Sequence, residues 1–222
     1  MIKLQGVHKS FTNFDGSVSE VLHDINFSVD PGELVVLKGA SGSGKSTILS
    51  LIASLNKPTS GEVIVDGKRV SKLVDRFASE FRSSSIGFVF QRYNLLPNLS
   101  VLDNVTLPLL PSDPSSDELK ERAMSSLKMF DMQDKAMQDT KTLSGGEQQR
   151  VAIARALVKD PAIIIADEPT ANLDEELSRS FIEILRILKL KQKTVVVATH
   201  DPLFFDLDLV DRIISVEKGK II

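Results

Sequence analysis

The sequence predicts an α/β fold in which a parallel sheet is flanked by helices. Several stretches are apolar at consecutive positions and rich in β-branched residues, which is typical of strands buried on both faces of a parallel sheet. Helical patterns separate these stretches, and such alternation indicates an α/β core. The apolar stretches are LVVL (34–37), IGFVF (86–90), AIIIA (162–166) and TVVVAT (194–199), and the helical patterns include KSTILSLIASL (45–55) and ELSRSFIEILRILKL (176–190).

The N-terminal part predicts a sheet of a different kind. Residues 2–7 alternate between apolar and polar side chains, which is typical of a strand with one exposed face. Four apolar residues further on alternate too, with one slip in register: Leu22, Ile25, Phe27 and Val29. Within SGEVIVDGKRV (60–70), the Asp66-Gly67 pair favours a tight hairpin turn. We therefore expect an antiparallel β subdomain next to the parallel core.

The middle of the chain predicts an inserted helical subdomain. After Gln91 the pattern is helical or irregular until about residue 160. Ser115 and Glu118 have the spacing of a capping box, ahead of a helix carrying Leu119, Ala123, Leu127 and Phe130. We assign residues 92–158 to the helical subdomain and residues 1–91 and 159–222 to the core, so that the chain forms one domain over 1–222.

Composition excludes several classes of protein. The 222 residues are 42% hydrophobic and 26% charged, as in ordinary globular proteins, and the absence of cysteine excludes disulfides and thiolate metal sites. The net charge of -3 gives no basic footprint for nucleic acid, so no nucleic-acid partner is expected. The longest apolar runs have the length of a strand, far short of the roughly 20 residues that span a bilayer. We expect a chain that is soluble when isolated.

A phosphate-binding loop is predicted at GASGSGKST (39–47), between an apolar strand and a helical pattern. Glycines let the main chain curl so that several N–H groups converge on phosphates, and the helix N-terminus adds its dipole. Lys45 is predicted to reach the β- and γ-phosphates, and the hydroxyl of Ser46 to reach Mg²⁺. The residues assigned to nucleotide binding here are Gly39, Ala40, Ser41, Gly42, Ser43, Gly44, Lys45, Ser46 and Thr47. This motif identifies a P-loop NTPase fold without distinguishing a kinase, a GTPase, a helicase or a transporter motor.

Polar residues follow three of the predicted strands. Asp167 and Glu168 end AIIIADE, at the edge where parallel sheets bind ligands. Asp167 is predicted to hold Mg²⁺, and Glu168 to act as general base on the attacking water. His200 ends TVVVATH and could sense the γ-phosphate, while Gln91 ends IGFVFQ and could reach Mg²⁺ or water. A lone histidine or glutamine at such a place is also compatible with a purely structural role.

A second anion site is predicted in LSGGEQQRVAIARAL (143–157). Ser144 and Glu147 have the spacing of a capping box, so Ser144 should begin a helix. Gly145 and Gly146 would leave the first turn of that helix bare, and such a helix start binds anions. One small domain with two sites for a γ-phosphate suggests that two copies share two nucleotides.

With these motifs the sequence resembles the ABC transporter ATPase family over essentially its whole length. LSGGEQQR is similar to the signature motif of that family, GASGSGKST to its Walker A and AIIIADEP to its Walker B, in the order of the family. Gln91 matches the Q-loop, Ala171-Asn172-Leu173-Asp174 the D-loop and His200 the switch histidine. Phe11 stands where family members carry the aromatic residue that stacks on adenine, with Phe14 as an alternative.

The resemblance implies an ATP hydrolase that binds ATP and Mg²⁺ in a head-to-tail dimer. Each ATP would lie between Lys45, Asp167, Glu168 and His200 of one copy and Ser144 and Gly146 of the other, with Gln91 and Asp174 nearby. An integral membrane permease would be the partner, which places the chain at the cytoplasmic face of the inner membrane as a peripheral subunit. Glu168 is an acid and not an amide, so active hydrolysis is expected.

Within the family the chain looks most like the lipoprotein-release and macrolide-export ATPases, called LolD- and MacB-type. KPTSGEV, IGFVFQRYNLLPNLSVLDNVTLPLL and ADEPTANLD carry this likeness, whereas Ala171 stands where that group usually has glycine. An alternative is an ABC ATPase that signals through a membrane partner without transport, as in cell-division regulation. A soluble ABC protein acting on ribosomes or DNA would usually have two nucleotide domains or a long coiled-coil insertion, and this chain has neither.

Overall fold

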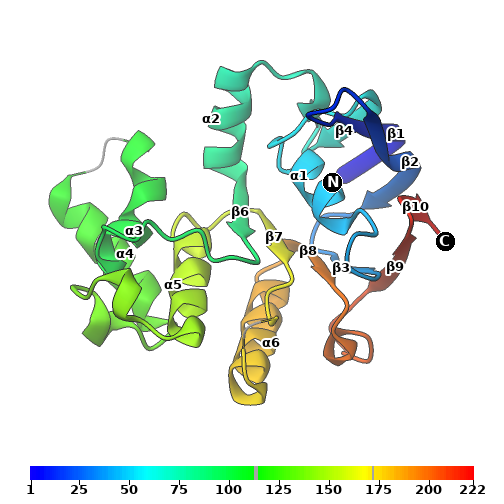
Figure 1. Ribbon diagram of the computed structural model, residues 1–222. Coiled ribbons are helices and arrows are strands. Elements are labelled where there is room, and N and C mark those ends of the chain that lie inside the picture. The colour runs from blue at the N-terminus through cyan, green and yellow to red at the C-terminus, as the bar shows by residue number, and fades with distance from the viewer. Residues whose placement is uncertain (113–114, 172) are drawn as a thin grey trace.

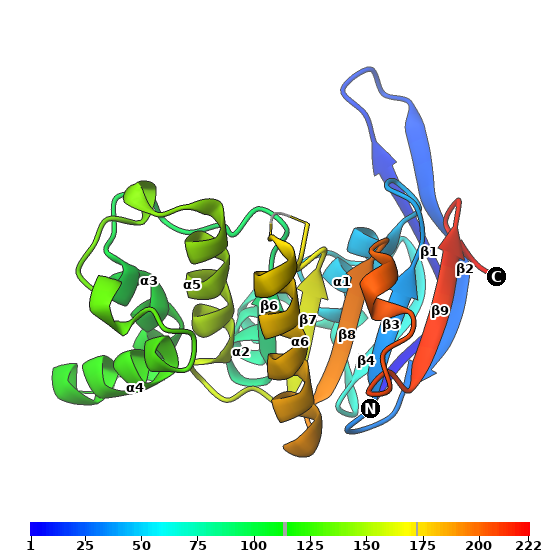
Figure 2. The same cartoon turned by 90° about the horizontal axis from the view of Figure 1, so that it is seen from below.

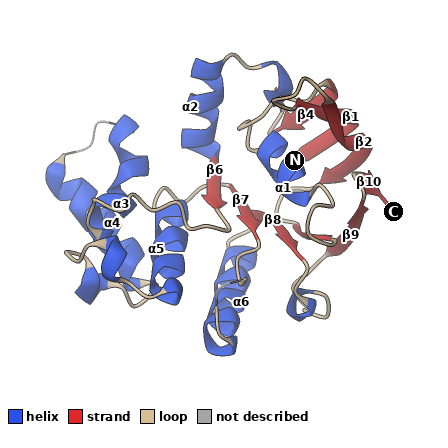
Figure 3. Ribbon diagram, in the orientation of Figure 1, coloured by secondary structure: helices blue, strands red, loops and turns tan. Residues whose placement is uncertain are grey.

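The computed structural model describes residues 1–112, 115–171 and 173–222, and over these residues the chain forms two sheets with helices packed against or beside them (Figures 1 and 3). The larger sheet has the strand order β10-β9-β3-β8-β7-β6, and the smaller has the order β2-β1-β4-β5. The predicted α/β fold with a parallel core and an antiparallel β subdomain is therefore confirmed.

The larger sheet contains every stretch that is apolar at consecutive positions. Strands β3, β6, β7, β8 and β9 are parallel, and β10 is antiparallel to β9 at one edge. Valine, isoleucine and leucine fill the central strands because both faces of the sheet are covered. The strand bounds are β3 Leu34–Lys38, β6 Ile86–Val89, β7 Ile163–Asp167, β8 Thr194–Thr199, β9 Arg212–Glu217 and β10 Lys220–Ile221.

The smaller sheet is antiparallel throughout, as the alternating pattern predicts. Asp66 and Gly67 have φ angles of 48° and 72° and close the hairpin between β4 and β5. The far end of the β1–β2 hairpin projects beyond the rest of the chain (Figure 2). The bounds are β1 Ile2–Thr12, β2 Val18–Val29, β4 Ser60–Val65 and β5 Lys68–Arg69.

Two helices cover opposite faces of the parallel sheet (Figure 1). Helix α1 (Lys45–Ile52) buries Ile48 and Ile52 against the face that also packs on the antiparallel sheet. Helix α6 (Glu175–Leu190) buries Phe181 and Leu185 against the other face. Because α1 begins directly after β3, the loop between them lies at the carboxyl edge of the sheet, where the ends of β7 and β8 also lie.

Three further helices lie together beside the core (Figure 2): α3 (Val101–Thr106), α4 (Ser116–Lys128) and α5 (Gly145–Leu157). Ser115 caps α4 by accepting a hydrogen bond from the N–H of Glu118, while the Glu118 carboxylate pairs with Arg122 at 3.7 Å. These helices fall within the range 92–158 assigned to the helical subdomain. Residues 113–114 lie outside the described residues.

Helix α2 (Asp75–Ser85) was not predicted, and it lies outside that range. Its buried residues are Ala78 and Phe81, and most of its other residues are polar. Short 3₁₀ turns complete the fold at Val70–Lys72, Leu107–Ser112, Gln133–Lys135, Thr140–Thr142 and Pro202–Phe204. In the described part of the chain, every helix is too short or too polar to cross a membrane.

Candidate functional site

The loop between β3 and α1 is curled by glycines with positive φ. Gly42 has φ 79° and Gly44 has φ 109°, conformations that L side chains rarely adopt. A Cβ at Gly44 would also lie 2.7 Å from Leu22 Cδ2. Gly44 is the N-cap of α1, so the main-chain N–H groups of the loop and of the first turn of α1 face the same space. This arrangement is suited to binding an anion.

Lys45 is buried at this loop, with 4% of its surface exposed. Its ammonium group donates to the carbonyl oxygens of Gly39, at 2.6 Å, and Ala40, at 3.1 Å. It also lies 3.4 Å from a carboxylate oxygen of Glu168, which follows β7. A buried cation is thereby held close to the place where the loop would bind phosphates.

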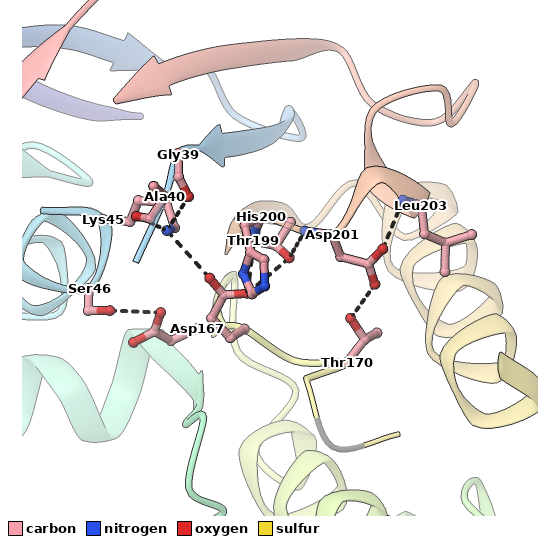
Figure 4. Close-up of polar contacts among 11 residues, drawn as sticks. Gly39, Ala40, Lys45, Ser46, Asp167, Thr170, Thr199, His200, Asp201 and Leu203 are labelled. Carbon is pink, nitrogen blue, oxygen red and sulfur yellow. Dashed lines mark hydrogen bonds and ion pairs between the residues drawn. The ribbon is translucent and has the colours of Figure 1, made fainter. Parts of the chain in front are cut away.

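Ser46 and Asp167 form the second contact between the loop and β7. The hydroxyl of Ser46 donates to Asp167 Oδ1 at 3.0 Å (Figure 4). Burial raises the pKa of the Asp167 carboxyl, and the charge of Glu168 raises it further, while the Ser46 bond and Lys45 oppose them. A hydroxyl and a carboxylate side by side match the oxygen ligands that Mg²⁺ prefers, so the residues present fit that ion.

Glu168 is held in place by β8 and the residues that follow it. Its main-chain N–H donates to Ala198 O at 2.8 Å, and its own φ is 45°. Its Oε2 atom accepts a hydrogen bond from Thr199 Oγ1 at 3.1 Å and lies 3.0 Å from His200 Nδ1. The parallel register pairs Asp167 with Ala198, and this pairing brings the two polar strand ends together.

Three further side chains, those of Thr199, Asp201 and Thr170, support this arrangement and were not predicted from the sequence. Thr199 Oγ1 accepts a hydrogen bond from the N–H of Asp201 at 3.0 Å. The carboxylate of Asp201 accepts bonds from Thr170 Oγ1 at 2.9 Å and from the N–H of Leu203 at 3.0 Å (Figure 4). Thr199 thus connects the Glu168 carboxylate to the turn after β8. An acid directly after His200 was the signal in the sequence that could have indicated this network.

The phosphate-binding loop and residues that follow β6, β7 and β8 line a cavity of about 190 Å³ at the carboxyl edge of the sheet. The lining comprises Val21, Ser41, Gly42, Ser43, Gly44, Lys45, Ser46, Thr47, Gln91, Glu168 and His200. The structure therefore brings the loop, Gln91, Glu168 and His200 together, with Asp167 bonded to Ser46 beside them. Gly39 and Ala40 face the same site through the carbonyls that bind Lys45.

Ser144 lies at the start of α5, outside this lining, and is exposed. The predicted capping box is present: the N–H of Ser144 donates to Glu147 Oε2 at 2.9 Å, and the N–H of Glu147 donates to Ser144 Oγ at 3.4 Å. Gly145 is exposed, whereas a Cβ at Gly146 would collide with the side chain of Leu177 on α6. Close packing between two helices is thus a second reason for glycine at position 146.

The other predicted binding residues also lie outside the cavity lining. Asp174 is the N-cap of α6 and accepts a hydrogen bond from the N–H of Leu177 at 2.9 Å. Phe11 is on β1 with 40% of its surface exposed, and the ammonium group of Lys9 lies 4.6 Å from its ring centre. Phe14 is fully exposed. Asn172, part of the predicted D-loop, lies outside the described residues.

Comparison with known proteins gives a consistent result. The family described as ABC transporter matches residues 22–171. An uncharacterised ABC transporter ATP-binding protein of Thermotoga maritima is 44% identical over 205 residues, covering 91% of this chain and 86% of the relative. YknY of Bacillus subtilis, also described as an uncharacterised ABC transporter ATP-binding protein, is 40% identical over 222 residues, covering 100% of this chain and 95% of the relative.

Solved structures show the same likeness in three dimensions. A dimeric structure of MJ0796, described as a bacterial ABC transporter cassette, matches with a TM-score of 0.93 and 41% identity, covering 100% of this chain and 96% of that one. The same protein in a post-hydrolysis state with ADP and Pi gives the same values. CbiO1 of Clostridium perfringens, part of the ABC transporter complex cbiONQ, matches with a TM-score of 0.82 and 29% identity, covering 100% of this chain and 86% of that one.

The family match over residues 22–171 covers the loop that holds Lys45, the acids Asp167 and Glu168 at the end of β7, and the whole of α5. The chain therefore belongs to the ABC transporter family, as an ATP-binding subunit with ATP hydrolase activity.

Proposed function

We propose that the chain works as a head-to-tail pair in which each ATP lies between the phosphate loop of one copy and the start of α5 of the other. The observation that carries this proposal is that Ser144 is exposed and outside the cavity that Lys45, Glu168 and His200 line. A capped, exposed helix start is suited to an anion, yet it lies outside the site that its own chain forms. The dimeric structures of MJ0796, 41% identical to this chain, support the arrangement.

In the proposed reaction, the loop N–H groups and Lys45 bind the β- and γ-phosphates. Glu168 accepts a proton from water as the water oxygen bonds to the γ-phosphorus, and the bond from that phosphorus to the β-γ bridging oxygen breaks to leave ADP. Thr199 and His200 hold the Glu168 carboxylate in the orientation that this step needs. Bound Mg²⁺, held by Ser46 and Asp167 with Gln91 nearby, would neutralise phosphate charge.

Other predicted residues have roles that depend on the second copy. Ser144, Gly145 and Gly146 would face the γ-phosphate bound by the partner copy, and Asp174 would lie near the contact between copies.

Phe11 would stack on adenine, once the Lys9 ammonium group leaves the face of its ring. The exposed position of Phe11 on a projecting hairpin is compatible with this role.

The decisive experiment uses Glu168→Gln, which keeps the size of the side chain and removes its basicity. We expect kcat for ATP to fall by at least about a hundredfold, which is the range for loss of a general base. The variant should form stable dimers with ATP and not with ADP, as measured by light scattering after size exclusion. A variant that hydrolyses ATP at the parent rate would rule out the role of Glu168, and one that stays monomeric with ATP would rule out the shared site.

We also propose that a membrane permease is the partner, with the chain bound at the cytoplasmic face of the inner membrane. A groove of about 510 Å³ between α2, β6 and residues 108–111 is the proposed docking site. Three cations line it and bind neutral oxygens: Arg82 donates to Ser54 O, Arg155 to Tyr93 O and Asn94 O, and Lys159 to Ser83 Oγ. In the described part of the chain none of the three forms an ion pair, so an acidic segment of the permease would complement the groove.

The permease is proposed to be of the lipoprotein-release or macrolide-export type. The stretches quoted above for that group support this proposal, and a neighbouring reading frame for a four-span permease with a large external domain would strengthen it. In the alternative, the partner signals without transport, as in cell-division regulation. Co-purification with the neighbouring membrane protein, followed by a transport assay of the reconstituted pair, separates the two, because a signalling pair would hydrolyse ATP and move no cargo.

A further inference from the structure

The first turn of α5 carries an ionised carboxylate whose two oxygens are both engaged. Glu147 Oε2 accepts a hydrogen bond from the N–H of Ser144 at 2.9 Å, and Oε1 forms an ion pair with the ammonium group of Lys135. The hydrogen bond from Lys135 holds the pKa of the Glu147 carboxyl below its usual range, and the bond from Ser144 adds to this effect. A full negative charge therefore lies beside Ser144 at neutral pH.

This charge conflicts with the task proposed for the start of α5. The positive end of a helix dipole and an exposed serine hydroxyl attract an anion. A carboxylate in the same turn, bonded to the N–H of Ser144, repels that anion. Like charges a few ångströms apart at a protein surface oppose one another enough to change affinity by about tenfold or more. The negative charge of Glu147 must therefore be offset if phosphates are to bind there.

The ammonium group of Lys135 supplies the positive charge that offsets Glu147, and it comes from a separate segment of the chain that is held in place by its contacts. It ends the 3₁₀ turn Gln133–Lys135, between α4 and α5. The residues after this turn are tied to the start of α3, because the N–H of Leu102 donates to Ala136 O at 2.8 Å and that of Val101 donates to Gln138 O at 2.9 Å. Ala136 is buried, which anchors the segment further. The Lys135 ammonium group is thereby presented to Glu147 by the packing of the helical subdomain.

We infer that Lys135 is a positioning residue for ATP binding between the two copies. It neutralises Glu147 and holds the carboxylate against the N–H of Ser144, so that the start of α5 can receive the phosphates bound by the partner copy. It acts through Glu147 and does not itself touch the nucleotide. This inference rests on the proposed shared site and adds a residue outside the signature motif on which that site depends.

The test measures ATP-driven dimerisation in the Glu168→Gln background, in which hydrolysis does not consume the ligand. Lys135→Met keeps an unbranched side chain of similar length and removes its charge. The ATP concentration that gives half-maximal dimer should rise about tenfold, the effect of one uncompensated charge near the phosphates. Adding Glu147→Gln should restore the parent value within about twofold, because removing the second charge removes the conflict. Lys135→Arg, which keeps the positive charge, should show the parent midpoint.

Two controls separate this role from a structural one. Lys141→Met makes the same change in net charge at a nearby lysine whose ammonium group donates to Asn98 Oδ1 at 2.7 Å, and it should leave dimerisation unchanged. Binding of a fluorescent ADP analogue to the monomer should be the same in all variants. An unchanged midpoint for Lys135→Met, or a failure of Glu147→Gln to rescue it, would overturn the inference. A Glu168→Gln parent that does not dimerise with ATP would instead overturn the proposed shared site, and this inference with it.

Discussion

The phosphate loop and the start of α5 both offer main-chain N–H groups at a helix N-terminus, but they differ in how they are completed. At the loop, Lys45 and Glu168 are 4% and 8% exposed, and segments from distant parts of the sequence supply their partners. At α5, Ser144 and Gly145 are exposed, and the cap is formed within one turn. The first region is completed by tertiary packing of its own chain, whereas the second is completed locally and leaves its outer side open.

Substitutions that separate binding to one copy from binding between copies should have the largest effects. Lys45→Met removes a buried cation and should lower the affinity of the monomer for ATP by about a hundredfold, the range for a hydrogen-bonded charge. Ser144→Arg should leave that affinity within about twofold and slow ATP turnover by about a hundredfold, because a bulky side chain would cover the start of α5. Titration with a fluorescent ATP analogue and a phosphate-release assay measure the two quantities. Equal losses of monomer affinity would contradict the division into two regions.

The two glycines at the start of α5 allow a finer comparison. Gly146→Ala should lower the free energy of unfolding by about 1–3 kcal/mol, because its Cβ would collide with Leu177 in a packed contact. Gly145→Ala is the matched control: its Cβ would lie 3.1 Å from the hydroxyl of Tyr93 at an exposed position, and the change should stay within about 0.5 kcal/mol. Urea unfolding measures both. Equal stabilities would mean that α6 yields to the extra methyl group.

Replacing Asp167 should change stability only modestly, and in the direction opposite to Gly146→Ala. Burial raises the pKa of this carboxyl in the folded chain, so its contribution to stability is present at low pH and is lost as pH rises through the folded-state pKa. Asp167→Asn removes that cost and should raise the free energy of unfolding at pH 7 by roughly 1 kcal/mol while abolishing Mg²⁺-dependent hydrolysis. The gain over the parent should disappear near pH 3. A variant less stable than its parent at pH 7 would show that the Ser46 bond outweighs burial.

The sequence predicted the structures that depend on neighbouring residues. The parallel strands, the hairpin at Asp66-Gly67 and the capping box of Ser144 and Glu147 each follow from a local pattern, and each is confirmed. Helix α2 was missed because most of its residues are polar, and strand β9 because Arg212 and Glu217 at its ends obscure a short pattern. Such elements are fixed by contacts with residues far along the chain.

In the candidate site, too, some features were predicted from the sequence and others were not. Residue types at strand ends indicated that Asp167, Glu168 and His200 meet near the phosphate loop. The register between β7 and β8 decides which atoms touch, so the bonds of Thr199 to Glu168 and of Thr170 to Asp201 could not be predicted. The collision that an added Cβ at Gly146 would make with Leu177 also depends on how two helices pack. The meeting of these residues at the loop was therefore predictable, and their supporting network was not.

The continuity of α5 with β7 has a genetic consequence. After α5 ends at Leu157, the chain passes directly into β7, which leads to Asp167 and Glu168. In the proposed dimer, this one stretch serves two different nucleotides, one through Ser144 and the other through Glu168. A cell that makes both a normal chain and one altered at Ser144 would pair them at random, and only a minority of dimers would have two intact sites. Where turnover requires both sites of a dimer, alleles that change this stretch should therefore be dominant over the normal allele.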